Sequence, residues 1–201
     1  MGLRHWLDAR RHGDGQWGAL LHPYQGRELV SLDLETTGLD PRTDHILSIA
    51  AVPVVDGRVG IARGFSCTVR AERAFGIDSI RHHRITPDES ADGASVTAAV
   101  ERLLRWLGNR PLLGYNLAFD VAMLAPHVRR IAGFSLPNRR IELAGEYFAR
   151  ERRHRADAAI DLRLEAICAD LGVPLLERHT ALGDAVTVGL CWLALAQRHR
   201  R

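Results

Sequence analysis

The sequence has 201 residues, which suffices for one domain with a sizeable core but leaves two full domains cramped. Hydrophobic residues make up 46% and charged residues 25%, as in ordinary soluble globular proteins, and no apolar run approaches the roughly 18 residues of a membrane span. The three cysteines are far apart and odd in number, which excludes a disulfide framework and fits a reducing compartment. Because the N-terminus has no secretory-type apolar stretch, we expect a cytoplasmic location and no membrane partner.

The net charge is +3, and all 27 basic residues are arginines. A positive excess suits a polyanionic partner, because basic side chains displace condensed counterions from phosphates. The same arginine-only, alanine-rich composition is equally expected from a GC-rich genome. Charge alone therefore does not identify a nucleic-acid partner.

The first 27 residues match no strong hydrophobic period and carry several glycines and a proline. We expect a short helix over Leu3–Arg11 and then a loop, which together form an N-terminal extension (residues 1–27) of unassigned role.

From residue 28 onward, the apolar pattern predicts strands and helices. The expected strands are Leu29–Leu34, Ile46–Val55, Val59–Val69, Leu112–Tyr115 and Arg140–Leu143. The expected helices are Val96–Leu107, Leu117–Ile131, Ile160–Leu171 and Leu182–Gln197. Asp56-Gly57, between two apolar runs, is a hairpin signal. A three-strand antiparallel meander followed by alternating helices and strands predicts an α/β fold, with a mixed central sheet that includes parallel strands and is flanked by helices.

The most informative segment is DLETTG, residues 33–38. Side chains on a strand alternate between faces, so Asp33 and Glu35 point the same way while Leu34 points into the core. Two neighbouring carboxylates repel each other unless a cation intervenes, and their hard oxygen atoms suit Mg²⁺ or Mn²⁺. The alternative is a solvated strand end that happens to carry two acids, which is the more common case for an isolated pair.

Two further aspartates occupy equivalent positions in two predicted helices. Asp120 lies four residues after Asn116, and Asp184 lies four residues after Thr180. Asn116 and Thr180 are the candidate N-caps. Both aspartates would project from a first helical turn, where the macrodipole favours negative charge. Each is a candidate metal ligand or, alternatively, a surface acid that only stabilises its helix.

His179 stands immediately before Thr180, in the loop that precedes the last predicted helix. On a continuous helix, its five-residue spacing from Asp184 would put the two side chains on different faces, whereas a loop residue is free to lean toward the acids. Imidazole titrates near neutral pH and is suited to take a proton from water. The alternative is a plain surface histidine, since the chain carries nine others.

Three segments carry these residues in chain order: DLETTG, GYNLAFD and HTALGD. Together they resemble the three exonuclease motifs of the DEDDh (DnaQ-like) family, which includes the proofreading epsilon subunit of bacterial DNA polymerase III, ribonuclease T and oligoribonuclease. The resemblance extends from about Glu28 to Leu195, so it makes residues 28–201 the exonuclease domain and implies a ribonuclease H-like fold. All five reactive positions hold the required types, with Asp33, Glu35, Asp120 and Asp184 as metal-binding acids and His179 as general base.

The resemblance implies a metal-dependent 3′–5′ exonuclease that hydrolyses the terminal phosphodiester bonds of DNA or RNA, using two divalent cations about 4 Å apart. One cation would be held by Asp33, Glu35 and Asp184 and would activate a water, from which His179 removes the proton. The other would be shared by Asp33 and supported by Asp120, and would stabilise the departing 3′-oxygen. Nucleoside 5′-monophosphates would leave one at a time.

The resemblance also implies contacts with the terminal nucleotide. The residues that would form them are Thr36, Gly38, Leu39, His83, Asn116 and Phe119. Base stacking on Leu39 or Phe119 would be sequence-tolerant, although core packing explains these two side chains equally well. Three departures from the family concern this region. Arg84 replaces a glycine that many relatives have after His83, Tyr115 stands where the polymerase subunit has a histidine, and Glu142 stands where many relatives carry an aspartate.

Two alternatives concern the function itself. A catalytically silent nucleic-acid-binding module of the same fold would be favoured by the loss of any acid, and none is lost. A polymerase partner is compatible with the family, but only a few residues follow the last predicted helix, so we expect free-standing action on nucleic acid 3′ ends. The resemblance is also compatible with a homodimer, as in ribonuclease T and oligoribonuclease.

Overall fold

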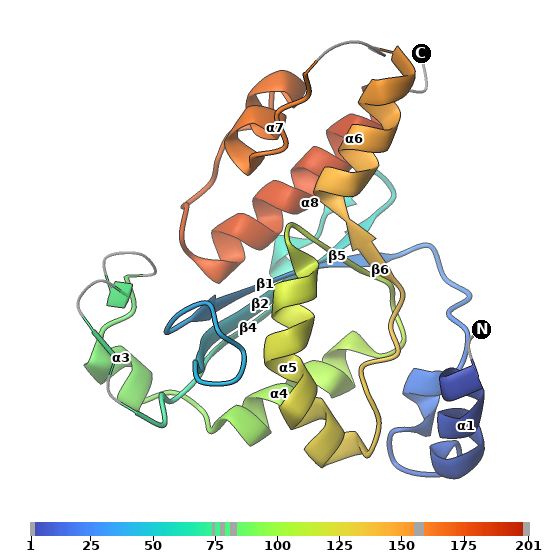
Figure 1. The fold of residues 1–201 in the computed structure, drawn as a ribbon, viewed down its shortest axis with the longest axis vertical. Helices are drawn as coiled ribbons and strands as arrows, with labels where there is room; N and C mark the ends of the chain where they lie inside the picture. The colour runs from blue at the N-terminus through green and yellow to red at the C-terminus, as the bar shows by residue number, and fades with distance from the viewer. Residues whose placement is uncertain (1–2, 74, 77–78, 81–83, 155–158, 199–201) are drawn as a thin grey trace.

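The computed structural model describes residues 3–73, 75–76, 79–80, 84–154 and 159–198, and these residues form a mixed six-stranded sheet with helices packed on it (Figure 1). The strands are β1 (Leu29–Thr36), β2 (Ile46–Val55), β3 (Arg58–Val59), β4 (Phe65–Thr68), β5 (Leu112–Gly114) and β6 (Arg140–Glu142). Their order is β3-β2-β1-β5-β6, with β4 also paired to β2. The predicted α/β class is confirmed.

The sheet combines the two kinds of pairing that the sequence predicted. β1 pairs with β2 in antiparallel register, and β2 pairs in the same way with β3 and β4. β1 and β5 are parallel, as are β5 and β6. The predicted hairpin turn is also present, since Asp56 and Gly57 adopt φ values of 50° and 74°.

The prediction of one continuous strand over Val59–Val69 was wrong. The chain instead forms the short β3, a 3-10 turn η2 (Ile61–Arg63) and then β4. A Cβ on Gly64 would lie 2.9 Å from the backbone oxygen of Ile61, so a glycine lets the chain turn closely there. Both pieces still pair with β2, but at different positions along it.

Helices cover both faces of the sheet, and two of them were not predicted. The helices are α1 (Leu3–His12), α3 (Pro87–Ala91), α4 (Val96–Leu107), α5 (Leu117–Ala132), α6 (Leu143–His154), α7 (Leu164–Leu171) and α8 (Ala181–Arg198). The sequence reasoning missed α3 and α6, and it began α7 four residues early, at Ile160. Among the described residues, no helix is both long enough and apolar enough to cross a membrane.

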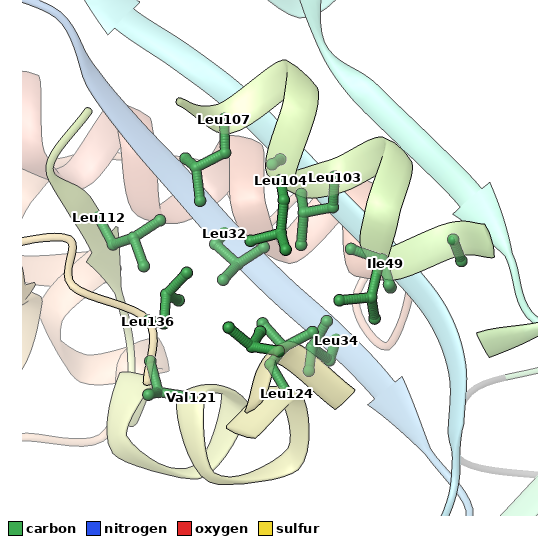
Figure 2. Packing of buried hydrophobic residues seen from close by; sticks show 14 of the residues in the cluster. Leu32, Leu34, Ile49, Leu103, Leu104, Leu107, Leu112, Val121, Leu124 and Leu136 are labelled. Carbon is green, nitrogen blue, oxygen red and sulfur yellow. The ribbon is translucent and has the colours of Figure 1, made fainter. Parts of the chain in front are cut away.

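One face of the central strand builds the main core. Leu32 and Leu34 of β1 point toward α4 and α5, where they meet Leu104 and Leu124 (Figure 2). Because strand side chains alternate, Asp33 and Glu35 point to the opposite face, which α8 covers (Figure 1). The core thereby fixes which side of the sheet carries the acids.

The first 27 residues contribute to the same core. Leu20 and Leu21, in the 3-10 helix η1 (Gly18–Leu21), are 5% and 2% exposed and belong to the cluster around β1. The ring of His12 lies 5.5 Å from that of Phe134, and Arg105 stacks on Trp17. A helix and then a loop were predicted here; the helix is present as α1, and the predicted loop contains the short η1. The boundary between an extension (1–27) and a domain (28–201) stays a prediction.

Candidate active site

Three acidic side chains from two distant segments meet on the face of β1 that α8 covers. Asp33 and Glu35 come from β1, and Asp184 comes from the first turn of α8. One oxygen atom from each carboxylate lies within 4.8 Å of the others. The chain therefore brings together the acids that the DLETTG and HTALGD segments predicted, and oxygen atoms at this spacing can share one divalent cation.

The strand is irregular where it leaves the site. Its pairing with β2 shifts register between Glu35 and Thr36, so that Thr36 lies opposite Ile46. Such a bulge bends a strand and re-aims its side chains. Here it separates the acids from the loop that begins at Thr37.

Asp120 approaches the same site from the other side. It lies in the first turn of α5, as predicted, and is 4% exposed. The charge of Asp120 is one of the causes that raise the pKa of Asp33, which places the two carboxylates in electrostatic contact. Asp120 is not part of the three-residue group within 4.8 Å, so its role as a metal ligand stays a prediction.

Burial and mutual repulsion disfavour the ionised forms of all four acids. Burial is the main cause that raises the pKa of Asp33 well above its ordinary value, and the charges of Asp120, Asp184 and Glu35 raise it further. Burial and the charge of Asp184 raise the pKa of Glu35 to about 7. Burial raises the pKa of Asp120 to about 8, against backbone hydrogen bonds from Asp120 itself and Leu34. Burial also raises the pKa of Asp184. Added positive charge would favour the ionised forms of these acids.

Arg178 is a site residue that the sequence reasoning missed. Its guanidinium donates a hydrogen bond to Glu165 on α7, and its Nε lies 3.6 Å from Oδ1 of Asp184. The Arg178 charge lowers the pKa values of Asp33, Glu35 and Asp184. The only sequence signal was its place directly before His179, and it was one of 27 arginines.

The loop before α8 has the predicted form. Thr180 caps the helix, because its hydroxyl oxygen accepts a hydrogen bond of 3.1 Å from the backbone N–H of Gly183. His179 lies in the preceding loop with φ 62°, and its backbone N–H donates to Oδ2 of Asp184 at 3.1 Å. This hydrogen bond thus holds the backbone of His179 against the carboxylate of Asp184.

The N-terminus of α5 differs from the prediction in one respect. Asn116 occupies the N-cap position, but its φ of 58° is left-handed and its side chain makes no capping hydrogen bond. The carboxylate of Glu142 accepts hydrogen bonds from the backbone N–H groups of Asn116 and Leu117 instead. Sequence spacing could not reveal this contact, since the two segments are far apart in the chain.

The predicted substrate contacts lie on two segments beside the acids. The hydroxyl of Thr36 donates to the backbone oxygen of Gly38 at 2.7 Å, and a Cβ on Gly38 would lie 2.6 Å from a carboxylate oxygen of Asp44, so the loop closes tightly. Leu39 is 84% exposed, which contradicts the core-packing alternative for that residue. Phe119 packs against the main core cluster, as that alternative expected.

Two of the remaining predicted contacts can be placed only in part. Asn116 is exposed at the start of α5. His83 lies outside the described residues. Its neighbour Arg84 adopts φ 61°, a left-handed conformation that favours the glycine found there in many relatives. Arg84 thus adopts a backbone conformation that a glycine adopts more readily.

The comparisons with known proteins place the chain among exonucleases. Residues 30–189 match the exonuclease family (RNase_T). The chain is 30% identical over 172 residues to a PolC-type DNA polymerase III of Oceanobacillus iheyensis, which covers 84% of the chain and 11% of that protein. It is 27% identical over 172 residues to the DNA polymerase III subunit epsilon of Rickettsia conorii, which covers 84% of the chain and 73% of that subunit.

Solved structures share the fold. Exonuclease I of E. coli in complex with a dT13 oligonucleotide has a TM-score of 0.68 at 19% identity, over 87% of this chain and 42% of that one. Exonuclease X in complex with 5′ overhanging duplex DNA has a TM-score of 0.62 at 23% identity, over 86% of this chain and 93% of that one. The predicted ribonuclease H-like fold is confirmed.

The fold and the acidic cluster define a metal-dependent nuclease, which is a hydrolase. Within that class, the chain belongs to the exonuclease family (RNase_T) and is a DnaQ-like exonuclease. The predicted family is therefore confirmed. The chain spans only about a tenth of the length of the PolC-type polymerases that it matches.

Proposed function

We propose that the protein is a 3′–5′ exonuclease that hydrolyses the terminal phosphodiester bonds of DNA or RNA and releases nucleoside 5′-monophosphates. The observation that carries this proposal is the convergence of Asp33, Glu35 and Asp184 within 4.8 Å, beside a fourth buried acid, Asp120. The family match supports the reaction class. The direction of digestion rests on the likeness to the epsilon subunit.

The donor set fits divalent cations of the Mg²⁺ or Mn²⁺ type. All the candidate ligands are carboxylate oxygens, which these hard cations prefer. Oδ1 of Asp184 is buried and accepts no hydrogen bond from the described residues, and its ion-pair partner, Nε of Arg178, lies 3.6 Å away, so this oxygen is available to a cation. Asp33, Glu35 and Asp184 would hold one cation, and Asp33 and Asp120 would hold the second. Bound cations would supply an acidified water and a counter-charge for the leaving oxygen.

His179 is the proposed general base. Its loop is held against Asp184 by the backbone hydrogen bond, so the imidazole belongs to a segment of fixed position beside the metal ligands. An imidazole at this place can take the proton of the attacking water at neutral pH.

The substrate is a nucleic acid 3′ end in single-stranded form. Thr36, Gly38 and Leu39, which follow Glu35 in the chain, and Asn116 and Phe119, at the start of α5, would contact the terminal nucleotide. His83 is a further proposed contact. Leu39 supports this assignment because an apolar side chain that is 84% exposed beside the acids offers a surface on which a base can stack. Exonuclease I, which shares the fold, is seen with a single-stranded oligonucleotide.

A catalytically silent binding module is the second candidate, and the acidic cluster argues against it. Two buried and two partly buried acids, all with raised pKa values, destabilise a fold that does not bind a cation. A module that only binds nucleic acid has no need of them, because negative charge repels phosphate.

We keep free-standing action as the proposal, with a cytoplasmic location. The names of the polymerase relatives point instead to a polymerase partner. Tight co-purification with a polymerase catalytic subunit would contradict free-standing action, and sedimentation equilibrium would show whether the protein is a homodimer.

The test of the function is a panel of 5′-labelled single-stranded and duplex DNA and RNA, each with Mg²⁺, Mn²⁺ or EDTA. A ladder that shortens one nucleotide at a time from the 3′ end, with Mg²⁺ or Mn²⁺ but not with EDTA, is the expected result. Asp33→Asn, prepared in parallel, should show no ladder. Immediate loss of the 5′ label as a mononucleotide, or digestion that continues in EDTA, would contradict the proposal.

A further inference from the structure

The first turn of α5, which carries Asp120, is capped from outside its own segment. A helix begins with backbone N–H groups that have no partner inside the helix, and an N-cap side chain usually accepts one of them. Asn116 stands at that position but makes no such bond, because its backbone is left-handed with φ 58°. The acceptor must come from elsewhere in the fold.

Glu142 provides the acceptor with both of its carboxylate oxygens. Oε1 accepts a hydrogen bond of 3.0 Å from the N–H of Asn116, and Oε2 accepts one of 2.9 Å from the N–H of Leu117. The negative charge also faces the positive end of the helix dipole. Glu142 therefore caps the start of α5 from another strand, at the N–H groups of the N-cap residue and of the first helical residue.

The sheet fixes the place of this carboxylate. Glu142 is the last residue of β6, and it lies opposite Gly114, the last residue of β5, in the parallel register. The chain turns directly from Gly114 into α5, and a Cβ on Gly114 would lie 2.9 Å from a methyl carbon of Leu117. Strand pairing and close packing thus hold Glu142 opposite the turn.

We propose that Glu142 is a positioning residue for Asp120, because its carboxylate fixes the turn from which Asp120 reaches the metal site. Asp120 follows Leu117 by three residues, so both lie in the same helical turn. Leu117, which is 2% exposed, packs in the core, while Glu142 accepts hydrogen bonds from the backbone N–H groups at the start of the turn. The inference rests on the proposed function, in which Asp120 supports one of the two cations.

The side-chain type matters as well as the position. Both oxygens of Glu142 are used as acceptors, so a glutamine would offer one oxygen and would turn an NH₂ group toward a backbone N–H. An aspartate keeps both oxygens and the charge but is shorter by one methylene. Glu142→Gln is therefore the disruptive variant, and Glu142→Asp is the conservative one.

The experiment compares the Mn²⁺ dependence of exonuclease activity in the wild type, Glu142→Gln, Glu142→Asp and a control, Glu146→Gln. Glu146 is a surface residue of the adjoining helix α6 that pairs with Arg150. Glu142→Gln should raise the Mn²⁺ concentration for half-maximal activity about 10- to 100-fold, as the loss of a residue that orients a metal ligand does. Glu142→Asp should recover part of this loss, and Glu146→Gln should match the wild type.

A purely structural role predicts a different result. It would lower kcat in proportion to the unfolded fraction, measured by circular dichroism, and would leave the Mn²⁺ concentration for half-maximal activity unchanged. That outcome, or a Glu142→Gln protein equal to the wild type, would overturn the inference.

Calorimetric titration with Mn²⁺ alone separates this inference from the proposed function. Glu142→Gln and Asp120→Asn should each weaken the same binding event, and the double variant should bind no more weakly than Asp120→Asn. Additive losses in the double variant would overturn the inference. If the wild-type protein bound Mn²⁺ but cleaved no nucleic acid, the proposed function would fail while this titration still decided the role of Glu142.

Discussion

The backbone N–H of His179 donates a hydrogen bond to Oδ2 of Asp184 at 3.1 Å. The bond joins the proposed base to a proposed metal ligand through the main chain and leaves the imidazole out of it. The position of the Asp184 carboxylate therefore does not require the histidine side chain, and the two contributions can be separated by mutation.

Replacing His179 should remove catalysis but leave metal binding intact. The φ of His179 is 62°, so His179→Asn is the better variant, because asparagine tolerates this left-handed conformation more readily than alanine does. Loss of a general base should lower kcat at least ~10²-fold. Calorimetry with Mn²⁺ should give wild-type affinity, since the backbone N–H remains. Near-normal kcat in either His179→Asn or His179→Ala would contradict the assigned role.

A larger residue at position 183, in the first turn of α8, should displace the loop that carries His179. A Cβ on Gly183 would lie 2.4 Å from the backbone oxygen of Leu176 and 2.5 Å from that of Glu177. Gly183→Ala must therefore push the loop away from α8, at a cost of about 1–3 kcal/mol in the free energy of unfolding, with most of the activity lost as well.

The control for this variant is Gly145→Ala. Gly145 lies in α6, and a Cβ there would meet no atom closer than 3.9 Å. Gly145→Ala should leave activity unchanged and raise the free energy of unfolding by about 0.5–1 kcal/mol, because alanine is more stable in a helix than glycine is. Chemical denaturation measures both variants, and a Gly183→Ala protein as stable and active as the control would show that the loop can move freely.

The local part of this site was predictable from sequence, and the contacts between segments were not. Strand alternation placed Asp33 and Glu35 on one face, and helix capping placed Asp120 and Asp184 in first turns. Both rules use only neighbouring residues. The contact between Arg178 and Asp184 depends on how the loop folds over α8, which no spacing in the sequence encodes.

The same distinction explains why parts of the fold prediction were wrong. The apolar run of Val59–Val69 predicted one strand, but only the pairing with β2 decides which of its residues join the sheet. Helix α6 begins directly after β6, so the two elements are read as one short strand in the sequence. Leu39 is 84% exposed in the loop that follows β1, which its residue type alone would not indicate.

The metal-free protein should lose stability as the pH rises. The pKa of Glu35 is raised from 4.5 to about 7, and that of Asp120 from 3.8 to about 8. Between the ordinary pKa of each group and its raised pKa in the folded protein, the folded state binds more protons than the unfolded state. The free energy of unfolding therefore falls as the pH rises from about 4 to about 8. Thermal melts in EDTA should show a Tm that is several degrees lower at pH 8 than at pH 5.5.

Divalent cations should reverse this trend. A bound cation favours the ionised carboxylates, so the rise in Tm on adding Mn²⁺ should be larger at pH 8 than at pH 5.5. Asp120→Asn should flatten the pH dependence in EDTA, because one of the raised groups is gone. A metal-free protein whose Tm increases steadily from pH 5.5 to pH 8 would contradict the electrostatic description of the site.

Arg178 should contribute most to the stability of the fold when no metal is bound. Its charge lowers the pKa values of Asp33, Glu35 and Asp184, and a bound cation would take over that role. Arg178→Gln should therefore lower the Tm in EDTA at pH 8 and increase the rise in Tm that Mn²⁺ produces. Arg163→Gln is the matched control, because Arg163 is 80% exposed and pairs only with the surface residue Asp161 among the described acids. An equal Mn²⁺-induced rise in the two variants would show that Arg178 does not compensate the acids, since a residue that shares the work of the cation must change the effect of adding it.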